Sequence, residues 1–376
     1  MYVGLNLLYL VPGATGGTET YARELVPALL AAAPDLRFTA FINPTARGIV
    51  EAWGERVSAT VIPVDVTHRW NWVRAEQTLL PPAARKTRVE LVHSLANTAP
   101  LWGPFRSVVT IHDLHFLRVP EAHLGLNRIG MRVLVPTAAR RCDRILTDAT
   151  VTATDLQYHL GVHPDRVDVV PLGGGRVRRA EPTPEDEVRR TLDAGTRPVV
   201  LSVSALRPHK NLERLISAVA LIPVERRPLL VICGYPTAHQ TRLEEHIRGC
   251  DLNADVRLLG WVNDAYLEGL YLTASAVLCP SLHEGFGLPV LEAMARGRPV
   301  GCSVGGALAE VAGDAAFLFE ATSVRQISLT VERLLSDREE VTRRVARGRA
   351  RADQFSWAAT AAGTLASYTR ALSAPA

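Results

Sequence analysis

The sequence lacks several features that mark whole classes of protein. Its five cysteines, in 376 residues, show no metal-binding spacing. An odd number of cysteines, some of them in apolar segments, favours a reducing compartment without disulfides, so we expect a cytoplasmic location. No apolar run reaches about 18 residues, so no membrane-spanning helix is expected. The hydrophobic content of 47% and the length predict an α/β protein of two domains, each with its own core.

Lysine is nearly absent, although the chain carries 42 basic residues. Lys86 and Lys210 are its only lysines, so arginine carries the formal net charge of +4. This mild basic excess is compatible with phosphorylated ligands, anionic lipid headgroups or nucleic acid. An ammonium kept at Lys210 suggests that a compact point charge is needed there, as phosphate sites often use. Residues 1–11 are apolar without a basic region before them, so they predict a first strand and not a signal peptide.

One stretch, residues 280–295, has the pattern of a strand, a glycine loop and a helix. An apolar run stops at Pro280, and helical spacing returns from Pro289. Such a turn points free N–H groups and the positive end of a helix dipole at a ligand, which suits an anion. Glu284 on the loop and Glu292 in the first helical turn would repel phosphate, so we expect them to bind hydroxyls. The pattern predicts a nucleotide sugar; the alternative is a surface glutamate and one that serves its own helix.

This motif resembles the E-x7-E signature of retaining glycosyltransferases of family 4, which have the GT-B fold. The resemblance implies an α/β protein of two doubly wound, Rossmann-like domains that face each other across a cleft. It implies transfer of a hexose from a nucleoside-diphosphate sugar to an acceptor hydroxyl, in polysaccharide, glycolipid or glycosylated-metabolite biosynthesis. Residues 112–117 resemble mannosyl- and related transferases of polysaccharide assembly, which favours mannose.

Other segments match the family in chain order. His112 follows a predicted strand, where the functional edge of a parallel sheet lies, and corresponds to a histidine that touches the donor sugar. Lys210 corresponds to a lysine that binds the donor diphosphate. The family's arginine five or six residues earlier is replaced here by Ala205 or Ser204, and Arg207 is the candidate substitute. The resemblance therefore implies four catalytic residues, His112, Lys210, Arg207 and Glu284.

The resemblance also implies a set of donor contacts. Gly16 and Gly17 form a loop through which the backbone approaches the donor. Trp261 and Val262, at the end of a strand expected over residues 255–262, would lie near the nucleobase. For the Trp261 side chain, ordinary burial is an equal alternative. A second glycine turn, at residues 303–310, is a further candidate phosphate contact. The full predicted donor-binding set is Gly16, Gly17, Lys210, Arg207, Trp261, Val262, Glu284, Gly285, Phe286, Gly287, Leu288 and Glu292.

The family's terminal helix crosses back onto the first domain, so we expect a discontinuous division of the chain. Residues 1–175 with the helix 356–376 would form the acceptor-side domain, and residues 176–355 the nucleotide-sugar-binding domain. No Asp-x-Asp motif follows a strand, so the expected reaction needs no metal and no cofactor beyond a GDP-, UDP- or dTDP-linked sugar as co-substrate. The acceptor would be a sugar, a lipid-linked molecule or a small molecule.

Two basic segments leave alternatives open. Residues 68–74 combine arginines and tryptophans, and the helix expected over 125–142 is rich in arginine. Either could contact an anionic membrane as a peripheral site at its inner face, but packing tryptophans and a solvated helix face are simpler interpretations. Rival functions are a GT-B epimerase or phosphorylase that uses the same site, and, more distantly, a nucleic-acid-binding protein. The second rests on the arginines alone, so we expect no nucleic-acid partner.

Overall fold

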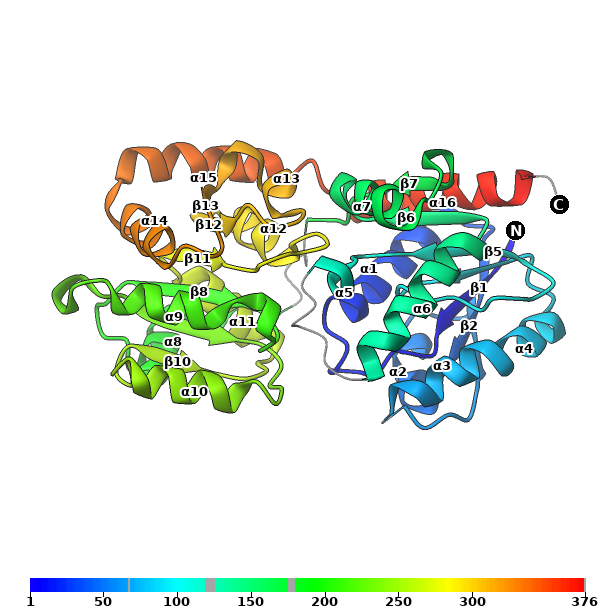
Figure 1. The fold of residues 1–376 in the computed structure, drawn as a ribbon, viewed down its shortest axis with the longest axis horizontal. Helices are drawn as coiled ribbons and strands as arrows, with labels where there is room; N and C mark the ends of the chain where they lie inside the picture. The colour runs from blue at the N-terminus through cyan, green and yellow to red at the C-terminus, as the bar shows by residue number, and fades with distance from the viewer. Residues whose placement is uncertain (67, 119–125, 175–179, 375–376) are drawn as a thin grey trace. The chain divides into compact units, whose positions relative to one another are not determined.

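The structure is a computed structural model that describes residues 1–66, 68–118, 126–174 and 180–374. The chain divides into two compact units (Figure 1). Unit 1 contains Met1–Leu117, His123–Gly173 and the C-terminal segment Phe355–Ala376, and unit 2 is built on Gly174–Gln354. The boundary predicted between residues 175 and 176 lies outside the described residues.

Unit 1 is organised around a parallel sheet, seven-stranded in the described chain, with the order β3-β2-β1-β4-β5-β6-β7. Its strands are β1 (Tyr2–Leu7), β2 (Arg37–Ile42), β3 (Val57–Val61), β4 (Leu91–Ser94), β5 (Arg106–Thr110), β6 (Arg144–Thr147) and β7 (Val167–Val169). Central strands such as β1 and β4 are buried almost throughout, as expected for parallel strands that are covered on both faces.

Helices cover this sheet. They are α1 (Gly17–Ala32), α2 (Arg47–Glu51), α3 (Arg69–Thr78), α4 (Leu80–Thr87), α5 (His115–Arg118), α6 (Leu126–Arg141), α7 (Thr150–Leu160) and α16 (Trp357–Ser373), with short 3₁₀ turns η1 (Pro44–Ala46) and η3 (Pro164–Arg166). The last helix begins where the Ser356 hydroxyl accepts a hydrogen bond from the Ala359 amide at 3.1 Å, an N-cap that fixes its start. It packs against α1, β5 and β6, so this helix belongs to unit 1 although it follows unit 2 in the sequence (Figure 1).

Unit 2 repeats the same plan. Its parallel sheet has six strands in the described residues, in the order β10-β9-β8-β11-β12-β13. They are β8 (Val199–Val203), β9 (Leu229–Cys233), β10 (Val256–Leu258), β11 (Ala276–Cys279), β12 (Val300–Ser303) and β13 (Phe317–Phe319). The core joins these strands to an apolar face of α9 that carries Leu215, Ile216 and Val219.

The helices of unit 2 flank this sheet. They are α8 (Glu185–Leu192), α9 (Leu212–Ala220), α10 (Gln240–Gly249), α11 (Asp264–Thr273), α12 (Leu288–Ala295), α13 (Leu308–Ala312), α14 (Val324–Ser336) and α15 (Arg338–Ala352). Three 3₁₀ turns join them, η4 (Pro208–Lys210), η5 (Val224–Arg226) and η6 (Gly313–Ala315).

Two strands are shorter than the sequence predicts. The apolar run 2–11 is a strand only to Leu7, because the chain then turns, and the Leu10 amide bonds the Leu7 carbonyl at 3.0 Å. The run 255–262 is a strand only over Val256–Leu258, because Gly260 adopts a positive φ of 65° just beyond it. Apolar periodicity alone does not show where a buried strand becomes a buried turn.

The strand orders locate the two expected ligand edges. In each sheet the order reverses at one point, between β1 and β4 in unit 1 and between β8 and β11 in unit 2. Open parallel sheets bind ligands beyond the carboxyl ends of the strands at such switch points, because the adjacent crossover connections run to opposite faces there. The segments that follow these strands are therefore the places to look for a site.

A buried chain of hydrogen bonds between side chains joins helix α16 to the sheet of unit 1. The Tyr368 hydroxyl lies 2.8 Å from Nδ1 of His93 on β4, and Nε2 of His93 lies 2.7 Å from the Thr110 hydroxyl on β5. His93 and Tyr368 are fully buried. Burial, followed by the charge of His112, lowers the pKa of His93 to about 3, so this imidazole is neutral at physiological pH.

We expect Tyr368→Phe to destabilise unit 1 by about 1–3 kcal/mol, because it leaves Nδ1 of His93 buried without a partner. Chemical unfolding followed by a probe in unit 1 measures this loss. Tyr158→Phe is the matched control, since that side chain is 82% exposed and should change little. Equal stability of Tyr368→Phe and wild type would show that the polar chain does not hold α16.

Candidate active site

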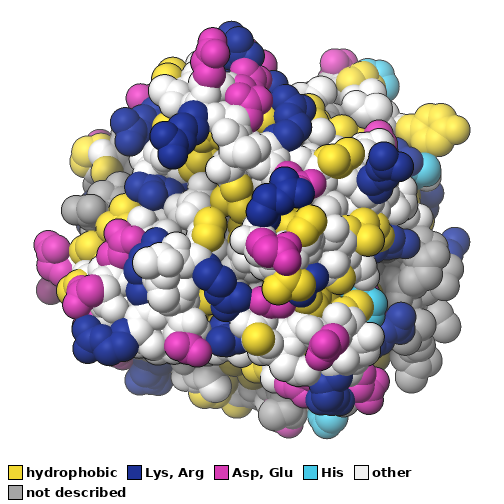
Figure 2. All heavy atoms as spheres, turned by 90° about the vertical axis from the view of Figure 1, so that its left-hand side faces the viewer, with side chains coloured by type: hydrophobic (Ala, Val, Ile, Leu, Met, Phe, Trp, Pro, Cys, Tyr) yellow, Lys and Arg dark blue, Asp and Glu magenta, His cyan; other side chains and the backbone are white. Residues whose placement is uncertain are grey.

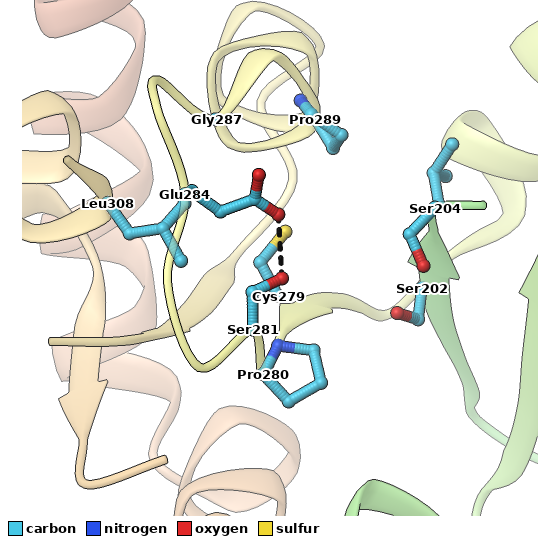
Figure 3. Close-up of a pocket in the computed structure, with 10 residues that line it drawn as sticks. Ser202, Ser204, Cys279, Pro280, Ser281, Glu284, Gly287, Pro289 and Leu308 are labelled. Atoms are coloured by element: carbon cyan, nitrogen blue, oxygen red, sulfur yellow. Dashed lines mark hydrogen bonds between the residues drawn. The ribbon is translucent and has the colours of Figure 1, made fainter. Parts of the chain in front are cut away.

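A pocket lies at the switch point of unit 2, between the carboxyl ends of β8 and β11. Figure 3 shows Ser202 and Ser204 on one side of it and Cys279, Ser281 and Glu284 on the other. Its lining residues are Ser202, Val203, Ser204, Cys279, Pro280, Ser281, Glu284, Gly287, Pro289 and Leu308. The pocket thus combines several hydroxyl groups and a carboxylate with the first turn of α12.

Two predicted site residues meet directly beside this pocket. The Lys210 ammonium donates to Oε1 of Glu284 at 2.5 Å, and the Ser281 hydroxyl donates to the same oxygen at 2.6 Å. Both charged side chains are mostly buried, with exposed fractions of 19% and 16%. An ion pair in such surroundings is screened by solvent far less than a surface pair. The structure therefore places the predicted phosphate-binding cation and the predicted hydroxyl-binding carboxylate at one point.

Asn211 explains why Lys210 lies there, although the sequence interpretation gave it no role. The residue is buried and adopts a positive φ of 59°, which ends the η4 turn. Its amide donates to the Pro280 carbonyl at 2.9 Å and to the Ala321 carbonyl at 2.7 Å. These bonds join the segment after β8 to the segments after β11 and β13. The sequence signal for this role was an asparagine directly before a helix, because asparagine is one of the few residues that adopt the left-handed conformation.

The glycine loop ends at the N-terminus of α12, as the sequence predicts. Gly287 has a φ of 112°, and a Cβ there would come within 2.5 Å of Leu308. Phe286 is buried and anchors the loop. Leu288 begins the helix, so the positive end of the helix dipole faces the pocket that Gly287 and Pro289 line.

The second glycine turn packs against the Glu284 loop, and the phosphate contact that the sequence suggested for it stays a prediction. A Cβ on Gly305 would lie 2.3 Å from the Leu282 carbonyl oxygen, and one on Gly306 would lie 2.3 Å from the Glu284 carbonyl oxygen. The Ala307 amide donates to that same Glu284 carbonyl at 2.9 Å. These glycines let one backbone lie directly on another, so they support the Glu284 loop from behind.

Glu292 is not among the residues that line the pocket. It lies one turn into α12 and not in its first turn, because the helix begins at Leu288. Its carboxylate accepts a hydrogen bond from the buried Tyr271 hydroxyl of α11 at 2.7 Å, and its exposed fraction is 9%. Burial and the adjacent Glu292 carboxylate raise the pKa of Tyr271, so the phenol stays protonated and donates. A ribose contact by Glu292 stays a prediction.

The other predicted donor contacts of unit 2 lie on the same sheet edge but outside the pocket. Arg207 is exposed and precedes the η4 turn, and the Trp261 side chain is 57% exposed. The exposure of Trp261 removes ordinary burial as the explanation for this residue. Backbone hydrogen bonds connect the ends of neighbouring strands at this edge. The Ser204 amide donates to the Cys233 carbonyl at 2.9 Å, and the Gly234 amide donates to the Gly260 carbonyl at 2.8 Å. Val262 is half-buried.

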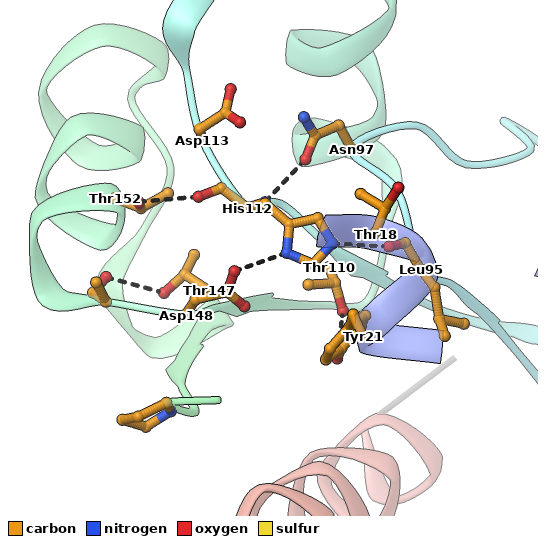
Figure 4. Close-up of polar contacts among 12 residues, drawn as sticks. Thr18, Tyr21, Leu95, Asn97, Thr110, His112, Asp113, Thr147, Asp148 and Thr152 are labelled. Carbon is orange, nitrogen blue, oxygen red and sulfur yellow. Dashed lines mark hydrogen bonds and ion pairs between the residues drawn. The ribbon is translucent and has the colours of Figure 1, made fainter. Parts of the chain in front are cut away.

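In unit 1, His112 lies just beyond the carboxyl end of β5 and makes four polar contacts (Figure 4). Its Nδ1 is 2.6 Å from Oδ2 of Asp148 and its Nε2 is 2.8 Å from the Leu95 carbonyl oxygen. Its amide donates to the Asn97 side chain at 2.8 Å, and its carbonyl accepts from the Thr152 hydroxyl at 3.3 Å. The sequence analysis predicted His112 but missed Asp148, although a polar residue directly after a strand was a usable signal.

Asp113 and His115 form a second acid–imidazole pair beside it, with Oδ1 and Nδ1 2.7 Å apart. Burial opposes the ionisation of Asp113, but His115 outweighs it and holds the pKa of this carboxyl well below its usual range. Gly16 and Gly17 lie at the start of α1, where a Cβ would meet open space on either residue. The donor role predicted for both glycines stays a prediction.

Within the described ranges, no group of three or more His, Cys, Asp or Glu side chains is arranged to hold a metal ion. None of the helices in the described part of the chain is both long and apolar enough to cross a bilayer.

Comparison with known proteins identifies the family. The model described as Glycosyltransferase Family 4 matches residues 15–173, and the model described as Glycosyl transferases group 1 matches residues 184–351. The O-antigen chain mannosyltransferase B of Escherichia coli is 30% identical over 267 residues, which cover 70% of this chain and 70% of that protein. The chain belongs to family 4 of the glycosyltransferases.

Solved structures agree with the fold of this glycosyltransferase. Sucrose-phosphate synthase of Thermosynechococcus elongatus aligns with a TM-score of 0.81 at 20% identity, over 98% of each chain. The Anabaena protein Alr3699/HepE, solved with UDP-glucose, aligns with a TM-score of 0.78 at 19% identity, over 98% of this chain and 100% of that chain. The predicted α/β fold class, GT-B with two doubly wound, Rossmann-like domains, is confirmed, and so is the glycosyltransferase class.

We expect Gly306→Ala to reduce turnover of the glycosyltransferase by about 10-fold or more, because the added methyl group would force the Glu284 backbone out of place. Steady-state kinetics measure the effect. Gly249→Ala is the control: it lies in unit 2 at the end of α10, and nothing lies within 4 Å of the added methyl group. Wild-type kinetics for Gly306→Ala would contradict the supporting role of the second glycine turn.

Proposed function

We propose that this glycosyltransferase moves a hexosyl group from a nucleoside-diphosphate sugar to an acceptor hydroxyl with retention at the anomeric carbon. The observation that carries the proposal is the Lys210–Glu284 pair beside the N-terminus of α12, at the switch point of unit 2. A cation and a helix N-terminus suit a diphosphate, and a fixed carboxylate next to them suits the hydroxyls of the attached sugar. A donor of this kind presents both groups within one molecule.

The predicted residues of unit 2 then have roles in the transfer. Lys210, Arg207 and the amides at the start of α12 would stabilise the charge that grows on the leaving diphosphate. Since these groups supply positive charge at the leaving group, we propose that the reaction needs no metal ion. We name no protein base, because the leaving phosphate oxygen can take the acceptor proton on the same face.

Further donor contacts follow from the same placement. Glu284 and the backbone of residues 285–288 would hold the sugar. Glu292 would hold the ribose, and its carboxylate would then accept hydrogen bonds from a ribose hydroxyl and from Tyr271. Trp261 and Val262 would lie beside the base, and Gly16 and Gly17 on unit 1 near the donor. On this account unit 2 is the donor-binding unit and unit 1 the acceptor-side unit.

Mannose is the sugar that we propose. The related Escherichia coli protein is named a mannosyltransferase of the O-antigen chain, which supports transfer of mannose in glycan biosynthesis. The nucleotide is GDP, UDP or dTDP, and the Anabaena neighbour contains UDP-glucose. Thermal-shift screening against these nucleotide sugars discriminates among them, because a ligand at about 100 times its Kd adds about 2.7 kcal/mol of stability.

The rival functions have less support. A GT-B epimerase or phosphorylase would use the same pocket, and product analysis with labelled nucleotide sugar separates it from a transferase. A nucleic-acid-binding protein would need a continuous basic surface. Figure 2 instead shows Lys and Arg side chains interspersed with Asp and Glu over the face in view. That rival also has no use for a glutamate fixed beside a lysine in a pocket.

We expect Lys210→Ala and Glu284→Gln each to lower kcat by about 10²–10³, the usual cost of losing one preorganised charged group. Rates are measured with labelled nucleotide sugar, with and without EDTA. The matched controls are Arg226→Ala and Glu332→Gln, since these residues form a cation–carboxylate pair in the same unit, 3.1 Å apart and more exposed. Wild-type turnover in either Lys210→Ala or Glu284→Gln would overturn the site.

We further propose that unit 1 contacts an anionic membrane through α3 and α4. Trp70 on α3 and Leu79 between the two helices are about half exposed, and Trp102 is 58% exposed. The Trp102 indole donates to the Gln77 carbonyl at 2.9 Å, which places this ring beside the end of α3. The exposed charges of these helices are basic, namely Arg74, Arg85, Lys86 and Arg88 on or directly after them. Exposed tryptophans among cations are typical of a surface that binds anionic lipid headgroups.

The two basic segments of the sequence, residues 68–74 and helix α6, differ in whether they expose tryptophan. Trp72 is buried, as the packing interpretation of residues 68–74 requires, whereas Trp70 is not. In the arginine-rich helix α6, Arg132, Arg140 and Arg141 are exposed, and the side chain of Arg128 lies outside the described part. We therefore assign the proposed membrane contact to α3 and α4, and we interpret the exposed arginines of α6 as a face in contact with solvent.

We expect the protein to co-float with vesicles that contain anionic lipid and not with neutral vesicles. The double variant Trp102→Ala, Leu79→Ala should bind such vesicles several-fold less, because it removes the exposed apolar side chains. Tyr158→Ala on α7 is the control, since it removes a side chain that is 82% exposed and lies elsewhere. Equal flotation of the double variant and wild type would contradict the assignment to this surface.

A further inference from the structure

Three loops at the carboxyl edge of unit 1 converge on His112. Leu95 and Asn97 follow β4, and His112 itself follows β5. Asp148 follows β6, and Thr152 lies just beyond it in the first turn of α7 (Figure 4). The side chain of His112 bonds the first and third loops, and so does its backbone, with partners at 2.6–3.3 Å. His112 therefore joins the segments on both sides of it through its side chain as well as its backbone.

The partners of the two ring nitrogens fix the protons of this imidazole. The Leu95 carbonyl can only accept, so Nε2 carries a hydrogen that it donates over 2.8 Å. An ionised Asp148 carboxylate can also only accept, so Nδ1 carries a second hydrogen, over 2.6 Å. A ring that donates from both nitrogens is an imidazolium. Its charge is balanced by the Asp148 side chain, of which 3% is exposed.

We propose that Asp148 is a positioning residue that keeps His112 doubly protonated, and that this His112–Asp148 pair holds the three loops in the arrangement that glycosyl transfer requires. The part of the inference that concerns transfer rests on the proposed function, whereas the proton positions and the loop contacts do not. His112 in this role binds protein groups with both nitrogens, so it is not available as a proton acceptor during the reaction.

The surrounding charges favour the imidazolium. Burial works against a charged ring, but the Asp148 carboxylate, the Leu95 carbonyl and the nearby Asp113 carboxylate outweigh it and raise the pKa of His112. On β4, His93 is neutral because burial lowers its pKa to about 3. On α1, the Tyr21 ring meets His112 edge to face at 4.9 Å, and burial keeps its phenol protonated by raising its pKa.

The sign of the pH dependence follows. A histidine with a raised pKa contributes its full stabilisation below its ordinary pKa and loses it as the pH rises through the folded value. The loops should therefore be held most firmly in mildly acidic solution, below the ordinary histidine pKa of 6.5, and they should loosen as the pH rises through the raised pKa of His112. A carboxylate with a purely steric role would produce no such dependence.

The experiment compares wild type with Asp148→Asn, which keeps the shape of the side chain and removes its charge. Nitrogen-15 NMR of histidine-labelled, donor-free protein should show that the His112 ring loses its second proton only above the pH range of an ordinary histidine, with this titration moved to lower pH in Asp148→Asn. Amide hydrogen exchange at residues 95–97 and 148–152 should become about tenfold faster or more in the variant, as expected on loss of a charged hydrogen bond. The pH at which kcat falls in alkaline solution should move down with the titration.

Asp165→Asn is the matched control, because Asp165 and His163 form an exposed acid–imidazole pair 3.5 Å apart in the same unit. It should leave His112, the exchange rates and the pH profile unchanged. A wild-type His112 that titrates at or below an ordinary histidine overturns the proposal, even if Asp148→Asn fails to fold. A moved titration with unchanged exchange and an unchanged pH profile overturns the positioning role. The expected NMR and exchange results without turnover on any nucleotide sugar would support the pair and overturn the proposed reaction instead.

Discussion

The ion pair between Lys210 and Glu284 is the contact on which the arrangement of unit 2 depends. A buried cation and carboxylate lose much hydration energy, and they recover it only when the geometry is well fixed. The fold fixes both ends through backbone contacts. Asn211 bonds the Lys210 segment to the Pro280 carbonyl, and Gly305 and Gly306 allow a second backbone to lie against the Glu284 loop. The polar site is rigid because glycine and asparagine, and not only charged residues, occupy the positions behind it.

In unit 1, His112 and Asp148 form a second charged pair that is largely removed from water. A charged imidazole is buried at the carboxyl edge of a parallel sheet, and a buried carboxylate balances it. The backbone amide and carbonyl of the same residue are bonded to the flanking loops. Behind it, neutral His93 joins Tyr368 of α16 to the sheet. The C-terminal helix is thus part of the packing that supports the site residue, although it lies more than 240 positions from His112 in the sequence.

Much of this could be predicted from local pattern. The strand, glycine loop and helix around Glu284 follow from an apolar run, two glycines and a proline, and the structure has all three elements. The fold class and the glycosyltransferase class are confirmed by the comparisons. Strand ends were predicted less well: residues 8–10 and 259–262 continue the apolar pattern, but a turn and a glycine with positive φ end the strands earlier. Burial determines the apolar pattern along the chain, whereas backbone hydrogen bonding determines where each strand ends.

The sequence by itself determined the elements and the chemical types at the functional edge: a lysine in a chain that otherwise uses arginine, a glutamate on a glycine loop, and a histidine after a strand. Only the tertiary structure decided which side chains meet. It placed Lys210 on Glu284, turned Glu292 toward Tyr271, gave the second glycine turn a supporting role and paired His112 with Asp148. The physical reason is that a local pattern fixes dihedral angles and burial over a few residues. Partners separated by 21 to 74 positions are brought together only by the order of strands in the sheets and by the packing of helices on them.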